Sequence, residues 1–151
     1  MYTKQALSKQ KTAFWTTFGR YMKPVLSEDG EPVSWLNYKT GNKYIHFVMD
    51  VDTRQAQIAV VVQHPDAGQQ QAFYERLVQL KKVFHEAIGE DDWTWAPDSR
   101  DEQGRLISVI QKTLPGVNLF KSEDWPAIIS FLKPRIIALD GFWSLVRYQF
   151  S

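Results

Sequence analysis

Three histidines, His46, His64 and His85, are the side chains best suited to acid–base or metal chemistry in this sequence. They fall in a predicted strand, a loop and a predicted helix, and no spacing among them matches a metal-binding motif. His85-Glu86 is the nearest approach to a zinc-binding motif. It lacks the second histidine, four residues after the first, that the helix of a zinc protease carries. We interpret all three as structural or surface residues.

His46 and Asp50 share one face of a predicted strand, which is how a general base and its orienting carboxylate could be arranged. Residues four apart on a strand are separated by about 13 Å, too far for a direct hydrogen bond. The spacing therefore favours a partly exposed sheet face over a catalytic pair.

The absence of cysteine excludes thiol catalysis, iron–sulfur clusters and cysteine zinc sites. No P-loop, GxGxxG or GxSxG motif occurs. The longest aliphatic run, Ile58–Val62, is far too short to span a bilayer, and the N-terminus lacks a signal peptide's apolar segment. We expect no catalytic residues, no cofactor, no metal site, no membrane segment and a cytoplasmic location.

Charge is segregated although the whole chain sums to only +1. Residues 1–24 contain no acid and carry +5, from Lys4, Lys9, Lys11, Arg20 and Lys23. Residues 86–102 hold seven acids against Arg100 alone. Three interpretations fit this pattern. The charges form two solvated faces, or the basic helix face binds phosphate backbones, or the two surfaces are complementary in a homodimer. The near-neutral total weakens the nucleic-acid interpretation.

The six tryptophans divide into two groups. Trp15, Trp125 and Trp143 lie on predicted helical core stripes, so we expect them to pack. Trp93 and Trp95 are two apart on a predicted strand and should project from the same face. They form either an exposed ledge for a ligand or partner, or a half-buried pair that covers a helix.

The elements that position these residues follow from apolar periodicity. A first helix carries Phe14, Trp15, Phe18, Tyr21 and Met22 on one stripe and should end near Lys23, before Pro24. The turn Thr40-Gly41-Asn42 predicts a hairpin of strands Val33–Tyr38 and Lys43–Val51. The strand Ala56–Gln63 is apolar on both faces, so we expect it to be central and covered on both sides.

The second half of the chain predicts a helix from about Gln69 to Ile88, ended by Gly89. Strands follow at Asp92–Ala96 and Arg105–Lys112. A closing helical region then begins near Ser122, and Pro134 should kink or break it. The fold class is therefore α+β in one domain, residues 1–151. Its predicted order is α-β-β-β-α-β-β-α, with a mixed, mostly antiparallel sheet packed by helices.

The first six elements, α-β-β-β-α-β, are also in the order of the PD-(D/E)XK nuclease core, so a relation to that fold is one possible interpretation. Such nucleases hold Mg²⁺ with an acid on the second strand and an acid-x-Lys motif on the third. Asp50 or Asp52 could serve as the first acid, but the strand Ala56–Gln63 has no acid and no lysine. A nuclease-like fold here should be inactive by that mechanism.

The chain resembles the bacterial family called domain of unknown function 4268. The resemblance lies in the early helix with Phe14-Trp15 and Phe18, the apolar strand Gln57–Val62 and the helix running to Ile88-Gly89. It continues through Trp95, Arg105-Leu106-Ile107 and the helix around Trp125. Ala96 and Gln57 stand where the family commonly has acids. The resemblance implies no established activity and no catalytic residues.

Three functional hypotheses remain open, of which the last in order is an unrecognised enzyme whose active residues are assembled from distant positions. The first is a non-catalytic domain that docks to another protein or to a second copy of itself, with Trp93 and Trp95 as a contact ledge. The second is a nucleic-acid-associated domain on a catalytically decayed nuclease-like fold, binding through Lys4, Lys9, Lys11, Arg20 and Lys23.

Overall fold

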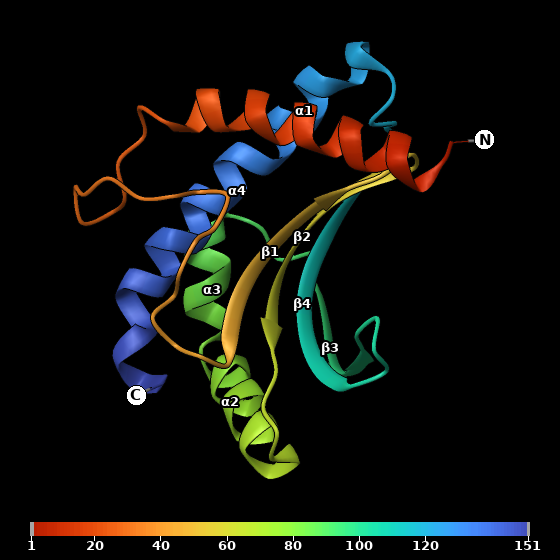
Figure 1. Cartoon of the computed structure of the whole chain (residues 1–151). Coiled ribbons are helices and arrows are strands. Elements are labelled where there is room, and N and C mark those ends of the chain that lie inside the picture. Colours follow the sequence, from red (N-terminus) through yellow and green to blue (C-terminus); the bar gives the residue numbers. More distant parts are fainter. Residues whose placement is uncertain (1, 151) are drawn as a thin grey trace.

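The computed structural model describes residues 2–150, which form a curved four-stranded sheet with helices on one face (Figure 1). The helices are α1 (Lys4–Met22), α2 (Ala67–Gln79), α3 (Lys81–Ile88) and α4 (Trp125–Val146), with short 3₁₀ turns at Ser122–Asp124 and Arg147–Phe150. The strands are β1 (Ile45–Val51), β2 (Gln55–Val62), β3 (Thr94–Arg100) and β4 (Leu106–Pro115).

The strand order is β1-β2-β4-β3, and every neighbouring pair is antiparallel. Helices α2, α3 and α4 lie against one face, while α1 crosses one end of the strands (Figure 1). The α+β class is confirmed. The elements follow the expected order, with one strand fewer near the N-terminus and one helix more in the middle.

The C-terminal end of α1 is where the sequence predicts it, whereas its start was not predicted. Thr3 caps the start, since its Oγ1 accepts a hydrogen bond from the Ala6 amide at 3.0 Å. The helix ends at Met22. Lys23 follows as its C-cap residue, and Pro24 comes directly after it.

The predicted core stripe of α1 is largely confirmed. Phe14, Phe18 and Met22 are buried in the main core with residues of the strands and of α4. Trp15 packs against their edge, but Tyr21 is 54% exposed and does not belong to the stripe. Burying each of the three large side chains contributes about 1.5–3 kcal/mol as an upper bound.

The predicted strand Val33–Tyr38 is wrong, because residues 23–44 form an irregular connection. Trp35 is buried and its Nε1 donates to the Val25 carbonyl at 3.0 Å. Tyr38 stacks on Phe47 of β1 and reaches α4 through its hydroxyl. These aromatic side chains enter the core without a strand to carry them.

The second predicted helix is two helices. The chain bends at Leu80, whose backbone angles of −96° and 12° are not helical, so α2 and α3 are separate elements. Gly89 then ends α3 in the left-handed conformation, at φ 77°, as expected.

The closing helix differs from expectation at one point. Pro134 does not end α4, which continues to Val146. Proline removes the hydrogen bond to the carbonyl of Ser130, and both residues are exposed, so water can satisfy that carbonyl. Ser122 lies in the preceding 3₁₀ turn and does not cap the helix.

Candidate functional site

Within residues 2–150, one face of the sheet has no helix packed on it, and we call this surface the concave face (Figure 1). Alternate residues of each strand lie on this face, and the register between the strands places them side by side in rows. The rows are His46–Val61–Val109–Ala96 and Val48–Ala59–Gln111–Thr94. β2 is central, as expected, and Ala59 on its second face is buried, although no helix within residues 2–150 covers that face.

A hollow of about 490 Å³ lies on the concave face. Val48 and Asp50 of β1 line it on one side, and Arg100 to Glu102, at the turn between β3 and β4, line it on the other. Because two distant strands border one hollow, the sheet must curl around it. This curvature explains how strand residues can be buried without a covering helix.

The floor of the hollow is apolar. Ala59, Ile107 and Val109 are buried in a cluster separate from the main core, with Val61 packed beside them. Val48 is 44% exposed at the edge of the same surface. The two polar floor residues, Gln57 and Gln111, hydrogen-bond to each other through their side-chain amides. The floor therefore presents mainly hydrocarbon to whatever enters it.

Ion pairs border the hollow. Lys11 of α1 reaches Asp50 at 3.1 Å, and Arg105 Nε contacts Asp101 at 2.8 Å. Desolvation would raise the pKa of Asp101, but hydrogen bonds from the Arg105 backbone and side chain and from the Gln103 backbone lower it. The rim thus combines charges of both signs.

A second hollow of about 540 Å³ continues the first past Ile107 and Asp101, which line both. Lys43, Tyr44 and His64 border its far side. The Tyr44 and His64 rings lie 4.0 Å apart, which gives this end an aromatic wall. The two hollows form one groove along the concave face.

Gln70 is a buried polar residue that the sequence analysis missed. It is 3% exposed and lies on α2 beside Ser108, where the pairing of β3 and β4 shifts register between Ala96 and Ser99. In the orientation that satisfies both ends, its amide donates to the Leu106 carbonyl at 3.1 Å and accepts from the Ser108 amide at 3.2 Å. Its spacing of four before the buried Tyr74 was the available signal.

The five basic residues of the N-terminal segment do not form one face. Lys4 and Lys11 line a groove together, and Lys11 is paired with Asp50. Lys9 and Arg20 lie about 140–160° around the helix from Lys4, on its solvent side. Lys23 is the exposed residue at the helix end. At most three of the five share a surface.

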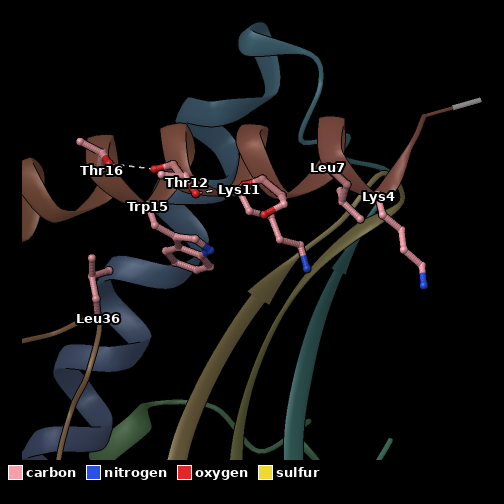
Figure 2. A pocket seen from close by; sticks show the side chains of 8 residues that line it. Lys4, Leu7, Lys11, Thr12, Trp15, Thr16 and Leu36 are labelled. Atoms are coloured by element: carbon pink, nitrogen blue, oxygen red, sulfur yellow. Dashed lines mark hydrogen bonds between the residues drawn. The ribbon is translucent and has the colours of Figure 1, made fainter.

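Figure 2 shows the groove along α1, which has a volume of about 570 Å³. Leu7, Lys11 and Trp15 project from α1 on one side, and Leu36 of the connection lies below Trp15 (Figure 2). Leu36 is 40% exposed. The groove is mainly apolar, with lysines at one end.

Trp93 and Trp95 project from the same side of the chain, as the spacing predicts, and that side faces α3. Both rings meet the Phe84 ring edge-on, with centroids 5.3 and 5.4 Å away. Trp93 is 5% exposed, and its Nε1 donates to Glu90 at 3.0 Å. Lys81 lies 4.8 Å above the half-buried Trp95 ring. Of the two interpretations, the pair that covers a helix is the arrangement found, and no exposed ledge remains.

The acidic segment is partly neutralised by cations from other elements. Glu90 binds Lys112 of β4 and Arg135 of α4, each at 2.7 Å, and Asp92 binds Lys112 at 2.8 Å. Desolvation would raise the pKa of Glu90, but hydrogen bonds from Arg135, Lys112 and Trp93 outweigh it and lower the pKa to about 2. This network joins three elements and is structural.

The histidines do not converge. His64 Nδ1 accepts from the Asp66 amide at 2.9 Å, next to the start of α2. His46 Nε2 and His85 Nε2 are buried and have no hydrogen-bond partner within residues 2–150. Across the same residues, no three acids or histidines are grouped closely enough to hold a metal ion. Nor does any helix there have the length and apolar character needed to cross a bilayer.

Comparison with known proteins agrees with this structural description. No curated protein and no solved structure matches the chain. The model of one family, described as Domain of unknown function (DUF4268), matches residues 10–147, from within α1 to the residue after α4. Since that match covers nearly the whole chain, the protein belongs to the DUF4268 family.

Proposed function

We propose that this chain is a non-catalytic interaction domain that binds another protein through its concave face. The observation that carries the proposal is the apolar floor formed by Ala59, Val61, Ile107 and Val109, on which no described element packs. Covering such a surface on association contributes roughly 25 cal/mol per Å² of apolar area. A recessed apolar floor with a polar rim, edged by the exposed Val48, is typical of a contact site.

The chemistry of the floor supports binding over catalysis. Gln57 and Gln111 use their amides on each other, and Asp101 is engaged by Arg105. The groups that could polarise a substrate are therefore already satisfied within the chain. A partner that inserts apolar side chains, flanked by charges of both signs, matches both floor and rim.

Site-specific photocrosslinking tests this proposal. Benzoylphenylalanine placed at Val61 should yield one defined adduct in the cells that produce the protein. The same group at Gln79, which is exposed on the helix side, should not yield it. The purified partner should bind the Val61→Glu variant at least about ten-fold more weakly than wild type, a loss of about 1.4 kcal/mol. A partner bound equally well by both proteins would refute the concave face as its site.

A second candidate function is association with nucleic acid on a decayed nuclease-like fold. Lys9, Arg20 and Lys23 favour it, because they lie toward solvent on a segment with no acid and are not ion-paired within residues 2–150. Lys9 and Arg20 are about 17 Å apart along the helix axis, a separation that spans several phosphates. No lysine in the sequence has an acid two residues before it, so the acid-x-Lys motif is absent whichever strand is compared, and binding without cleavage is the expected activity.

Titration of DNA and RNA at low and moderate salt tests this second candidate. Affinity should fall with salt, and a variant with Lys9, Arg20 and Lys23 changed to Ala should lose both the affinity and most of the salt dependence. Lys133→Ala on α4 is the control. No binding at low salt would eliminate the hypothesis.

A further inference from the structure

The two edge strands of the sheet differ in how they are protected from pairing with another chain. β3 carries Pro97, charged neighbours at Asp98 and Arg100, and a shift of register between Ala96 and Ser99. These are the features by which natural sheets block an edge. β1 pairs with β2 over its whole length with no shift and contains no proline or lysine.

The register shows which main-chain groups of β1 are free. The Gln63 amide donates to the Tyr44 carbonyl, and the Asp52 amide donates to the Gln55 carbonyl, both at 2.9 Å. Hydrogen-bonded pairs alternate along an antiparallel ladder, so the residues between these two pairs that bond to β2 are His46, Val48 and Asp50.

Phe47, Met49 and Val51 therefore direct their N–H and C=O groups away from β2. None of these groups takes part in a hydrogen bond with another part of residues 2–150. At Ile45 the edge is already occupied, since its amide donates to Asn42 and its carbonyl accepts from Thr40 Oγ1. The free stretch begins at Phe47.

We infer that this free edge of β1 pairs antiparallel with the β1 edge of a second copy of the chain, around a two-fold axis beside Val48. Phe47 then lies opposite Met49 of the second copy, and the two residues exchange both N–H···O bonds. By symmetry the same exchange occurs on the other side of the axis. The result is one continuous sheet of two copies.

Charge complementarity selects the second copy as the occupant. On the concave face this register sets His46 opposite Asp50 of the second copy, and Val48 opposite its equivalent. Val48 is 44% exposed, and Asp50 is exposed beside its contact with Lys11, so both side chains can meet a neighbouring strand. The apolar Val48 pair contributes about 0.2–1 kcal/mol, and the Asp50 carboxylate lies where it can accept a hydrogen bond from the His46 imidazole.

The flanking residues repeat this complementarity. Lys39 and Lys43 precede β1, whereas Asp50 and Asp52 lie at its other end, with Arg54 beyond them in the turn. Antiparallel pairing brings the basic start of one strand to the acidic end of the other, and does so twice. A parallel arrangement would place like charges together, which is destabilising.

The groove along α1 extends the same surface. It includes Lys11, whose contact with Asp50 places it near the C-terminal end of β1. Trp15 and Leu36 lie on the side of β1 away from β2 (Figure 2). The residues that precede β1 in the second copy arrive at this position, so the dimer covers apolar area beyond the strands themselves.

Sedimentation velocity over a wide concentration range tests the inference, and wild type should be a dimer. Met49→Pro removes an outward N–H and leaves the bonds to β2 intact, because Met49 does not bond to β2. Met49→Ala truncates the same side chain but keeps the N–H. We expect Met49→Pro to dimerise at least about ten-fold more weakly than Met49→Ala. Equal association of the two variants, or a monomeric wild type, would overturn the inference.

A charge exchange tests the register without proline. His46→Asp and Asp50→Lys should each weaken dimerisation. The first sets two carboxylates opposite one another across the axis, and the second removes the acceptor that faces His46. An equal mixture of the two variants should form a mixed dimer with restored affinity, because the altered residues then attract. Failure of the mixture to recover would rule out this register. Val61→Glu, on the floor of the concave face, should dimerise normally, which separates this inference from the proposed function.

Discussion

The Tyr38 hydroxyl donates a hydrogen bond to Asp140 Oδ1 at 2.5 Å, joining the irregular connection to the middle of α4. Asp140 Oδ2 accepts a second bond from the Glu28 amide at 2.7 Å. The carboxylate is 6% exposed, so these bonds compensate for its removal from water. A single aspartate thus fixes two points of the connection between residues 23 and 44.

Tyr38→Phe should lower the free energy of unfolding by about 1.5–3 kcal/mol, the range for a hydrogen bond to a charged group. The variant leaves Asp140 buried with only the Glu28 amide as a partner. Urea unfolding measures the change. Tyr21→Phe is the matched control, because Tyr21 is exposed on α1 and should tolerate the same substitution within about 0.5 kcal/mol.

The same pair predicts a response to alkaline pH. Burial, followed by the hydrogen bond to Asp140, raises the pKa of Tyr38 well above its usual range. The pKa of Tyr38 is higher in the folded state than in the unfolded state. The protonated hydroxyl therefore contributes its full stabilisation below the pKa of the unfolded tyrosine, about 10. That contribution is lost as pH rises from there through the folded-state pKa. The unfolding free energy of wild type should therefore fall more steeply above this pH than that of Tyr38→Phe, and parallel curves would contradict the assignment.

These long-range bonds explain which parts of the fold could be predicted from sequence. The C-terminal end of α1 and the left-handed Gly89 depend on local signals, a proline and a glycine, and were predicted correctly. Val33–Tyr38 alternates like a strand, but Trp35 and Tyr38 are held by partners at Val25 and Asp140 that no local pattern encodes.

The candidate site was less predictable for a related reason. The second face of β2 is apolar at Ala59 and Val61. This sequence pattern is the same whether a helix covers the face or the sheet curls around it. The spacing of Trp93 and Trp95 correctly placed them on one side, but only packing on Phe84 decides that this side is the interior. The sequence therefore predicts which residues lie on the same face better than it predicts what that face contacts.

Gln70 offers a test of the irregular pairing between β3 and β4. Gln70→Leu should lower the free energy of unfolding by about 1–3 kcal/mol, because it leaves the Leu106 carbonyl and the Ser108 amide buried without a partner. Gln71→Leu, on the exposed side of α2, is the control. Hydrogen exchange should locate the loss, with faster exchange at the Ser108 amide in the Gln70 variant. Unchanged exchange there would show that Gln70 does not support the shifted register.

Glu90 predicts how the protein responds to acid. Its pKa is lowered from 4.5 to about 2, so its interactions with Arg135, Lys112 and Trp93 stabilise the folded state above the unfolded-state value. That contribution is lost as pH falls from about 4.5 to about 2. Allowing for solvent screening of a partly exposed group, it amounts to about 1–2 kcal/mol. Glu90→Gln should therefore be less stable than wild type at neutral pH, and the two should converge at low pH. Glu86→Gln, an exposed residue of the same acidic segment, should follow the wild-type curve. If Glu86→Gln and Glu90→Gln behave alike, general charge repulsion and not this network governs acid unfolding.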